Sequence, residues 1–140
     1  MSRLIYIDSN TYIDFIEDRQ DRYRSYGEVA RQIFRRGLDC EFKVILSPLV
    51  MQEVENNSYG GDFAELLNSL QEAAKIVETR FTEEDERCAR ELSILRKTPY
   101  KDTCHAVIAA RMKADFLITR NLKDFQNLSD IINIISPDYF

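Results

Sequence analysis

Short apolar runs alternate along this chain with longer segments in which apolar residues recur at helical spacing. The run at 4–7 has the sequence Leu-Ile-Tyr-Ile and, with Arg3 before it, predicts a strand at 3–7. Similar runs predict four further strands, at 43–46, 76–77, 116–118 and 131–135, the last of them interrupted by Asn133.

The segments between these runs have the period of amphipathic helices. We predict helices over 12–16, 29–38, 63–70, 88–95 and 99–113. A further helix should begin at Ser47-Pro48, a capping residue followed by proline at the first helical position. Strands that alternate with helices predict an α/β domain with a mostly parallel sheet and right-handed crossovers. The polar segments 19–27 and 56–62 are expected to be irregular loops.

Length and composition narrow the class of protein. With 140 residues, 44% hydrophobic and 31% charged, the chain is expected to form a single soluble domain over 1–140. No apolar stretch approaches the ~20 residues of a membrane span, and the N-terminus lacks a secretory apolar region, so we expect a cytoplasmic protein. The three cysteines, Cys40, Cys88 and Cys104, are expected to be reduced packing residues. A net charge of -5 excludes a broad basic surface for long duplex DNA.

Acidic residues stand at the edges of several apolar segments. Asp8 directly follows the first strand, and Asn121 and Asp124 follow the strand at 116–118. Because ligands bind outside the carboxyl ends of parallel strands, these side chains are expected at one cleft. Taken alone, Asp8 is equally well explained as the cap of the next helix, and Asn121 is also a plausible cap.

Two more carboxylates belong to this set. Glu53 shares a helix face with Leu49 and Val50, where an unpaired charge is costly. Asp102 lies in the first turn of its helix, where a carboxylate also favours the helix dipole. Carboxylates that converge on one cleft repel one another unless a cation lies between them, so the set predicts a divalent-metal site. The single histidine, His105, is interpreted as a helix residue without a catalytic role.

The order of these motifs resembles the PIN domain family, and within it the small VapC-type ribonucleases of toxin–antitoxin systems. The resemblance rests on Ile7-Asp8-Ser-Asn, on Glu53 after Ser47-Pro-Leu-Val, on Lys101-Asp102 before an alanine-rich helix, and on the run at 119–125, Thr-Arg-Asn-Leu-Lys-Asp-Phe. It extends from Arg3 to about Pro137. It implies a three-layer α/β/α sandwich with a five-stranded parallel sheet.

The resemblance also implies a function. Members of the family are metal-dependent nucleases that act on RNA and bind Mg²⁺ or Mn²⁺ through their acidic cluster. Position by position, Asp8, Glu53 and Asp102 match the three core acids. The fourth position is divided between Asn121, where many relatives carry aspartate, and Asp124. The family further suggests a homodimer and a small antitoxin partner.

Residue chemistry supports such a mechanism. Mg²⁺ prefers oxygen ligands, and a bound metal activates water and neutralises charge that grows on a phosphate. We expect Asp8 and Asp102 to hold the principal metal, Glu53 to bind it or to orient the attacking water, and Asn121 with Asp124 to complete the rim. The side chains expected to contact substrate are Asn10, Thr119, Lys101, Arg120 and Lys123.

Two other interpretations stay open. An aspartate after an apolar strand also resembles the nucleophile of haloacid-dehalogenase-type phosphatases. Those enzymes carry a second acid two positions on, where this chain has Asn10, and they would leave Glu53 without a role. The other alternative is a non-catalytic PIN domain that binds RNA or protein.

Overall fold

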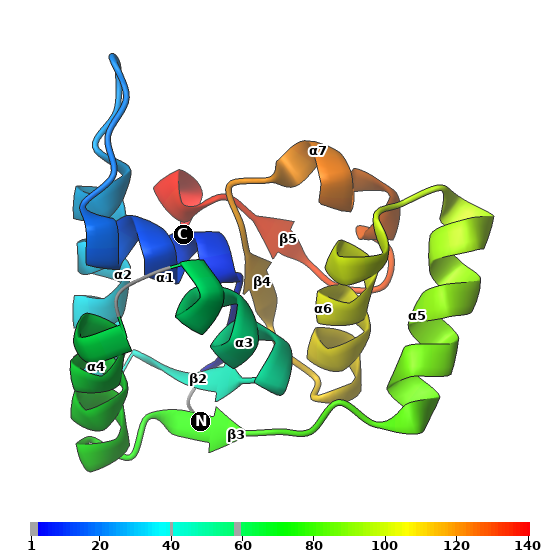
Figure 1. Cartoon of the computed structure of the whole chain (residues 1–140), viewed down its shortest axis with the longest axis horizontal. Coiled ribbons are helices and arrows are strands. Elements are labelled where there is room, and N and C mark those ends of the chain that lie inside the picture. Colours follow the sequence, from blue (N-terminus) through cyan, green and yellow to red (C-terminus); the bar gives the residue numbers. More distant parts are fainter. Residues whose placement is uncertain (1–2, 40, 58–59) are drawn as a thin grey trace.

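The computed structural model describes residues 3–39, 41–57 and 60–140. Its centre is a five-stranded parallel sheet with the strand order β3-β2-β1-β4-β5, which confirms the predicted architecture (Figure 1). The strands are β1 (Arg3–Ile7), β2 (Phe42–Leu46), β3 (Ile76–Glu78), β4 (Phe116–Ile118) and β5 (Ile134–Ile135). The fifth strand is shorter than predicted because the amides of Ile131 and Ile132 donate to the Leu128 carbonyl and extend the preceding turn.

Seven helices flank this sheet in the described part of the chain. They are α1 (Ser9–Glu17), α2 (Tyr26–Leu38), α3 (Pro48–Asn57), α4 (Gly60–Glu72), α5 (Glu83–Arg96), α6 (Tyr100–Arg111) and α7 (Leu122–Phe125), with 3₁₀ turns at Gln126–Leu128 and Pro137–Tyr139. Helices α1 to α4 contact one another, whereas α5 packs along α6 at the opposite end of the molecule (Figure 1). None of the described helices is long and apolar enough to cross a membrane.

The core explains why the central strands have continuous apolar sequences. In β1, the side chains of Ile5, Tyr6 and Ile7 are all fully buried, as are those of Leu117 and Ile118 in β4. A parallel sheet with helices on both faces buries both sides of each strand, so the alternation seen in half-exposed strands is absent. Asp8, the first residue after β1, therefore lies at the carboxyl end of the strand.

Several details differ from the sequence-based expectations. The predicted loop at 56–62 is wrong for its described residues, because α3 continues to Asn57 and α4 begins at Gly60. Residues 58–59 lie outside the described part. The two glycines do not prevent the helix because the apolar face of α4, which includes Phe63, is buried against the core and its packing outweighs their low propensity.

The segment predicted as irregular at 19–27 forms a hairpin-like projection from the body of the protein (Figure 1). Gln20 and Ser25 form an antiparallel bridge, and the Asp21 carboxylate accepts hydrogen bonds from the amides of Tyr23 and Arg24. The last two predicted loop residues already belong to α2. Local side-chain-to-backbone bonds therefore order a segment whose polar composition suggested none.

Helix α5 buries less than its apolar spacing predicted. Ala89 is buried and Leu92 is partly buried, but Leu95 is 76% exposed. Cys88 is also exposed and so is no packing residue, whereas Cys104 is buried as expected; Cys40 lies outside the described residues.

Candidate metal centre at the carboxyl edge of the sheet

Asp8 lies at the junction of β1, β4 and α1. Its Oδ1 accepts a hydrogen bond from the Ser9 amide at 2.8 Å and its Oδ2 accepts one from Thr119 Oγ1 at 2.8 Å. The side chain is therefore both the N-cap of α1 and the partner of a residue 111 positions away. Capping and site formation, which the sequence presented as alternatives, are compatible because the two carboxylate oxygens have different partners.

Glu53 comes from α3 and is held at both of its carboxylate oxygens. Oε2 accepts from Ser9 Oγ at 2.5 Å, and Oε1 lies 2.9 Å from His105 Nε2. Burial alone would raise the pKa of Glu53, but the hydrogen bond and charge of His105 and the hydrogen bond from Ser9 outweigh it and lower the pKa below its ordinary value. Glu53 is thus kept as a carboxylate.

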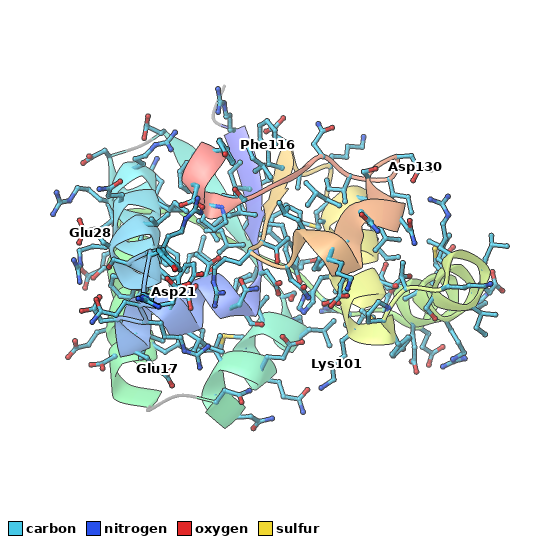
Figure 2. All side chains as sticks on the ribbon, turned by 90° about the horizontal axis from the view of Figure 1, so that it is seen from above. Glu17, Asp21, Glu28, Lys101, Phe116 and Asp130 are labelled. Atoms are coloured by element: carbon cyan, nitrogen blue, oxygen red, sulfur yellow. The ribbon has the colours of Figure 1, made fainter. Side chains whose placement is uncertain are left out.

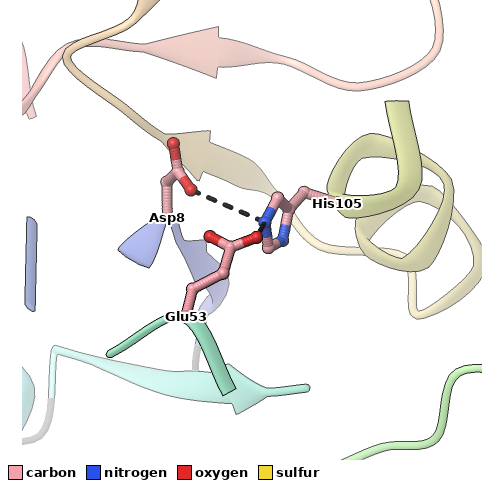
Figure 3. A group of neighbouring side chains, drawn as sticks. All are labelled: Asp8, Glu53 and His105. Carbon is pink, nitrogen blue, oxygen red and sulfur yellow. Dashed lines mark hydrogen bonds and ion pairs between the residues drawn. The ribbon is translucent and has the colours of Figure 1, made fainter. Parts of the chain in front are cut away.

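His105 completes a group of three side chains that converge from β1, α3 and α6 (Figure 3). Its Nε2 lies 3.8 Å from Asp8 Oδ1, and the three prospective ligand atoms of Asp8, Glu53 and His105 all lie within 4.8 Å of one another. Burial lowers the pKa of His105. The hydrogen bond to Glu53 and the charges of the surrounding carboxylates raise it by more than burial lowers it, so the net shift of the pKa is upward.

Asp102 belongs to the same electrostatic cluster. It lies in the first turn of α6 and is half-buried. Burial and the negative charge of Asp8, with smaller contributions from Asp124 and Glu53, raise its pKa to about 6. A cation bound beside this carboxyl group would favour its ionised form and so oppose the upward shift of its pKa.

The fourth corner is a pair of residues connected to Asp8 through Thr119. Asn121 donates from Nδ2 to Asp124 Oδ2 at 2.7 Å, and its amide donates to Thr119 Oγ1 at 3.0 Å. Asn10 Nδ2 also donates to Thr119 Oγ1, at 3.4 Å. The structure therefore places both candidates for the fourth position together. The side-chain amide of Asn121 orients the Asp124 carboxylate.

The three basic side chains expected to contact substrate differ in their surroundings. Arg120 is committed to the buried carboxylate of Asp14 and stacks on the ring of Tyr26, 4.1 Å from the guanidinium carbon to the ring centroid. Lys101 lies in the first turn of α6, at the rim of the molecule (Figure 2), close enough to lower the pKa of Glu53. Lys123 is exposed.

The sequence places His105 on its helix but does not predict that it meets Asp8 and Glu53. The available signal was its spacing from Asp102, because residues three apart on a helix share a face. Tyr6 gave a weaker signal, as the only residue in the run at 4–7 with a polar group.

The donor set suits a divalent cation. Carboxylate oxygens are the usual ligands of Mg²⁺ and Mn²⁺, and imidazole is accepted by several transition metals. The ligand atoms of Asp8 and Glu53 lie within 4.8 Å of each other, and burial and neighbouring carboxylates raise the pKa of Asp102 to about 6; a bound cation would offset this repulsion.

Comparisons with known proteins bear on the fold and the family of the chain. Among solved structures, a toxin–antitoxin complex from Klebsiella pneumoniae is similar, with 18% identity and a TM-score of 0.65, over 97% of this chain and 98% of that one. FitAcB from Neisseria gonorrhoeae matches with 16% identity and a TM-score of 0.61, over 97% and 99% of the two chains. VapBC2 from Rickettsia felis, bound to a DNA fragment from their promoter, matches with 16% identity and a TM-score of 0.59, over 95% and 98%.

These identities are low, so the structural matches establish the fold alone. A search of curated proteins finds no match. The family model described as PIN domain, however, matches residues 5–131, which include every candidate residue of the centre. The chain belongs to the PIN domain family.

Proposed function

We propose that this PIN domain, comprising residues 1–140, is a Mg²⁺- or Mn²⁺-dependent endoribonuclease. The observation that carries the proposal is the convergence of Asp8, Glu53 and His105 within 4.8 Å, next to an Asp102 whose pKa is raised to about 6 by burial and by the surrounding carboxylates. A cation bound beside Asp102 would offset the charges of the neighbouring carboxylates that raise its pKa.

The residues of the centre would have different roles around a bound metal. Asp8 and Asp102 would be the principal ligands, with Glu53 either a further ligand or the group that orients the attacking water. Asn121 and Asp124 complete the rim. The chemistry that Mg²⁺ or Mn²⁺ supplies when bound is neutralisation of the phosphate charge and activation of water.

RNA binding must be local because the chain is acidic overall, with a net charge of -5. Lys101 and Lys123 lie next to Asp102 and Asp124 in sequence and have no ion-pair partner among the described residues. They are the cations available to a phosphate backbone. Asn10 and Thr119, which meet beside Asp8, supply polar contacts at the same edge.

The test of this function is cleavage of defined RNAs by the purified protein in Mg²⁺, in Mn²⁺ and in EDTA. We expect cleavage with either metal, none in EDTA, and a loss of at least ~100-fold in Asp102→Asn, because the variant lacks a carboxylate that would hold the metal, and the metal supplies the neutralisation of phosphate charge. The matched control is Asp115→Asn, which changes an acid at the amino end of β4 rather than in the centre. Cleavage that survives both EDTA and Asp102→Asn would contradict the proposal, and absence of any cleavage would favour a non-catalytic PIN domain.

We further propose that the protein is the cytoplasmic toxin of a toxin–antitoxin pair and that it forms a homodimer. The structural similarity to a toxin–antitoxin complex from Klebsiella pneumoniae supports the first part. The second is supported by α5, where Ile94 and Leu95 are 75% and 76% exposed. Expression in a bacterial host tests the toxin assignment: growth arrest by the wild type and normal growth with Asp8→Asn are expected, and equal growth would contradict it.

A further inference from the structure

A row of buried hydrogen bonds leads from the core into the metal centre. Ser47 Oγ lies 2.8 Å from the Tyr6 hydroxyl, which lies 2.5 Å from His105 Nδ1, and His105 Nε2 lies 2.9 Å from Glu53 Oε1. Ser47 and Tyr6 are fully buried and His105 is almost so. The row therefore connects β1, the end of β2 and α6 to Glu53, the acid of the centre that lies in α3.

Counting donors and acceptors assigns the roles in this row for a neutral His105 ring. A carboxylate can only accept, so His105 Nε2 carries the hydrogen that points at Glu53. In the neutral ring Nδ1 is then an acceptor, which the Tyr6 hydroxyl satisfies, and Tyr6 in turn accepts from Ser47. Ser47 Oγ also accepts from the Val50 amide at 3.2 Å. Each polar group in the row has a partner.

A second buried tyrosine shows that the row is not a general property of this core. Tyr12 is as buried as Tyr6, yet its hydroxyl has no hydrogen-bond partner among the described residues. Both rings fill space in the core, but only the hydroxyl of Tyr6 is directed at a side chain of the metal centre. The chain thus contains its own control for the effect of a buried tyrosine hydroxyl.

The row determines how Glu53 is presented. With Oε1 held by His105 and Oε2 held by Ser9, the plane of the carboxylate is fixed, and each oxygen keeps a second lone pair for another partner. Partners that hold a metal-binding carboxylate in this way tune the affinity of a site without entering it.

We propose that His105 is a positioning residue, which Tyr6 anchors and which holds Glu53 in the orientation required for a cation bound by Asp8 and Asp102, without itself binding that cation. This inference rests on the proposed function. The geometry favours it over ligation by His105 because the Nε2 hydrogen is already directed at Glu53 at 2.9 Å, whereas Asp8 Oδ1 lies 3.8 Å away. Binding of a metal by His105 Nε2 would require the ring hydrogen to move to Nδ1. The hydrogen bonds of the Tyr6 and Ser47 hydroxyls would then have to reverse their direction.

The test is Mn²⁺ titration by calorimetry of the wild type and four variants. His105→Ala should weaken Mn²⁺ binding by ~10–100-fold, the range found when a partner of a metal ligand is lost. His105→Gln, which keeps an N–H donor of similar reach, should restore most of the affinity. Tyr6→Phe should weaken binding less than His105→Ala does, and Tyr12→Phe, the matched control, should bind as the wild type does.

Pulsed electron paramagnetic resonance of the Mn²⁺ complexes separates positioning from ligation. We expect no directly coordinated nitrogen in the wild type. A strong ¹⁴N coupling that disappears in His105→Gln would overturn the inference, as would unchanged affinity in both His105→Ala and Tyr6→Phe. If His105→Ala does not fold, judged by thermal melting, Tyr6→Phe and His105→Gln still decide the matter. A wild type that binds no Mn²⁺ would overturn the proposed function as well, whereas normal binding by wild type and variants alike overturns this inference alone.

Discussion

Arg120 and Asp14 form a two-point ion pair, with Arg120 Nε 2.5 Å from Asp14 Oδ2 and a terminal nitrogen 2.9 Å from Oδ1. The Asp14 side chain is almost fully buried, whereas the arginine side chain remains about one third exposed. The pair connects α1 to the segment after β4, next to Thr119 and hence to Asp8. This geometry gives Arg120 a structural role that its position beside the acids does not reveal.

Arg120→Ala is therefore expected to destabilise the protein. Removing one partner leaves the carboxylate of Asp14 buried without compensation, and the partial exposure of Arg120 brings the expected loss to about 2 kcal/mol. Chemical denaturation measures it. Lys123→Ala, the matched control, removes an exposed cation and should change stability by less than ~0.5 kcal/mol. Equal stability of the two variants would contradict the structural role.

Arg111 should be a second structural arginine. Its Nε donates to Asp85 at 2.8 Å, and a terminal nitrogen donates to Thr79 Oγ1 and to the Arg80 carbonyl. Asp85 is buried and also forms the capping box of α5 with Thr82. Arg111→Ala should cost about 2 kcal/mol, since a buried carboxylate loses its partner.

The control for Arg111 is Arg90→Ala, which removes the exposed i,i+4 pair with Glu86. Such pairs contribute no more than about 0.5 kcal/mol. Urea denaturation of both variants measures the difference. If Arg90→Ala lowered the free energy of unfolding as much as Arg111→Ala does, the buried network would not contribute more to stability than an exposed ion pair.

The raised pKa of Asp102 predicts how the metal-free protein responds to pH. Because its folded-state pKa is about 6 against an ordinary value of 3.8, the folded protein binds the proton more tightly than the unfolded chain does. Stability should therefore rise as pH falls from 7 through 6 and should be lowest above 6. Since Asp102 is half-exposed, the change is about 1 kcal/mol after allowance for solvent screening.

Thermal melting in EDTA at pH 5 and pH 7 measures this contribution by comparing wild type with Asp102→Asn. The variant should lose the part of the pH dependence that Asp102 causes, and identical pH dependence in the two proteins would count against the raised pKa. With Mn²⁺ present, binding should weaken as pH falls below about 6 because protons compete with the metal for Asp102.

The exposed side chains of α5 predict a change in oligomeric state. Leu95→Glu places a charge in the middle of the apolar surface formed by Ile94 and Leu95 and should convert a dimer into a monomer in analytical ultracentrifugation. Tyr23→Glu, at the projecting hairpin, alters an equally exposed large side chain at the other end of the molecule and should leave the dimer intact. A wild type that sediments as a monomer would contradict the homodimer directly.

The sequence allowed the sheet to be predicted because its strands are nearly continuous apolar runs between helical segments. The errors occurred where other interactions outweigh local composition. Gly60-Gly61 indicated a loop, but burial of the Phe63 face makes the segment helical. At 88–95 the apolar spacing indicated a buried face, yet Leu95 is exposed to solvent. The reason is that the extensive contacts of α5 are with one neighbouring element, α6.

The acids of the centre could be proposed from their positions at strand ends and helix starts. His105 could not, because its role depends on Tyr6 and Glu53, which approach it from 99 and 52 residues away. Arg120 was placed beside the acids by its position in sequence, whereas its ion pair with Asp14 spans 106 residues. Adjacency in sequence is a weak guide to the direction of a long side chain.

The central claim, that these carboxylates form a divalent-metal centre, is tested most directly by calorimetric titration of Mn²⁺ into wild type, Asp8→Asn, Glu53→Gln and Glu55→Gln. Asparagine at position 8 can still accept from the Ser9 amide and cap α1, so a loss of binding would not reflect a lost helix. Glu55 is an exposed acid on the same helix as Glu53 and serves as the control. We predict wild-type affinity in Glu55→Gln and at least ~10-fold weaker binding in the other two variants; no Mn²⁺ binding by the wild type, or undiminished binding in Asp8→Asn, would contradict the account.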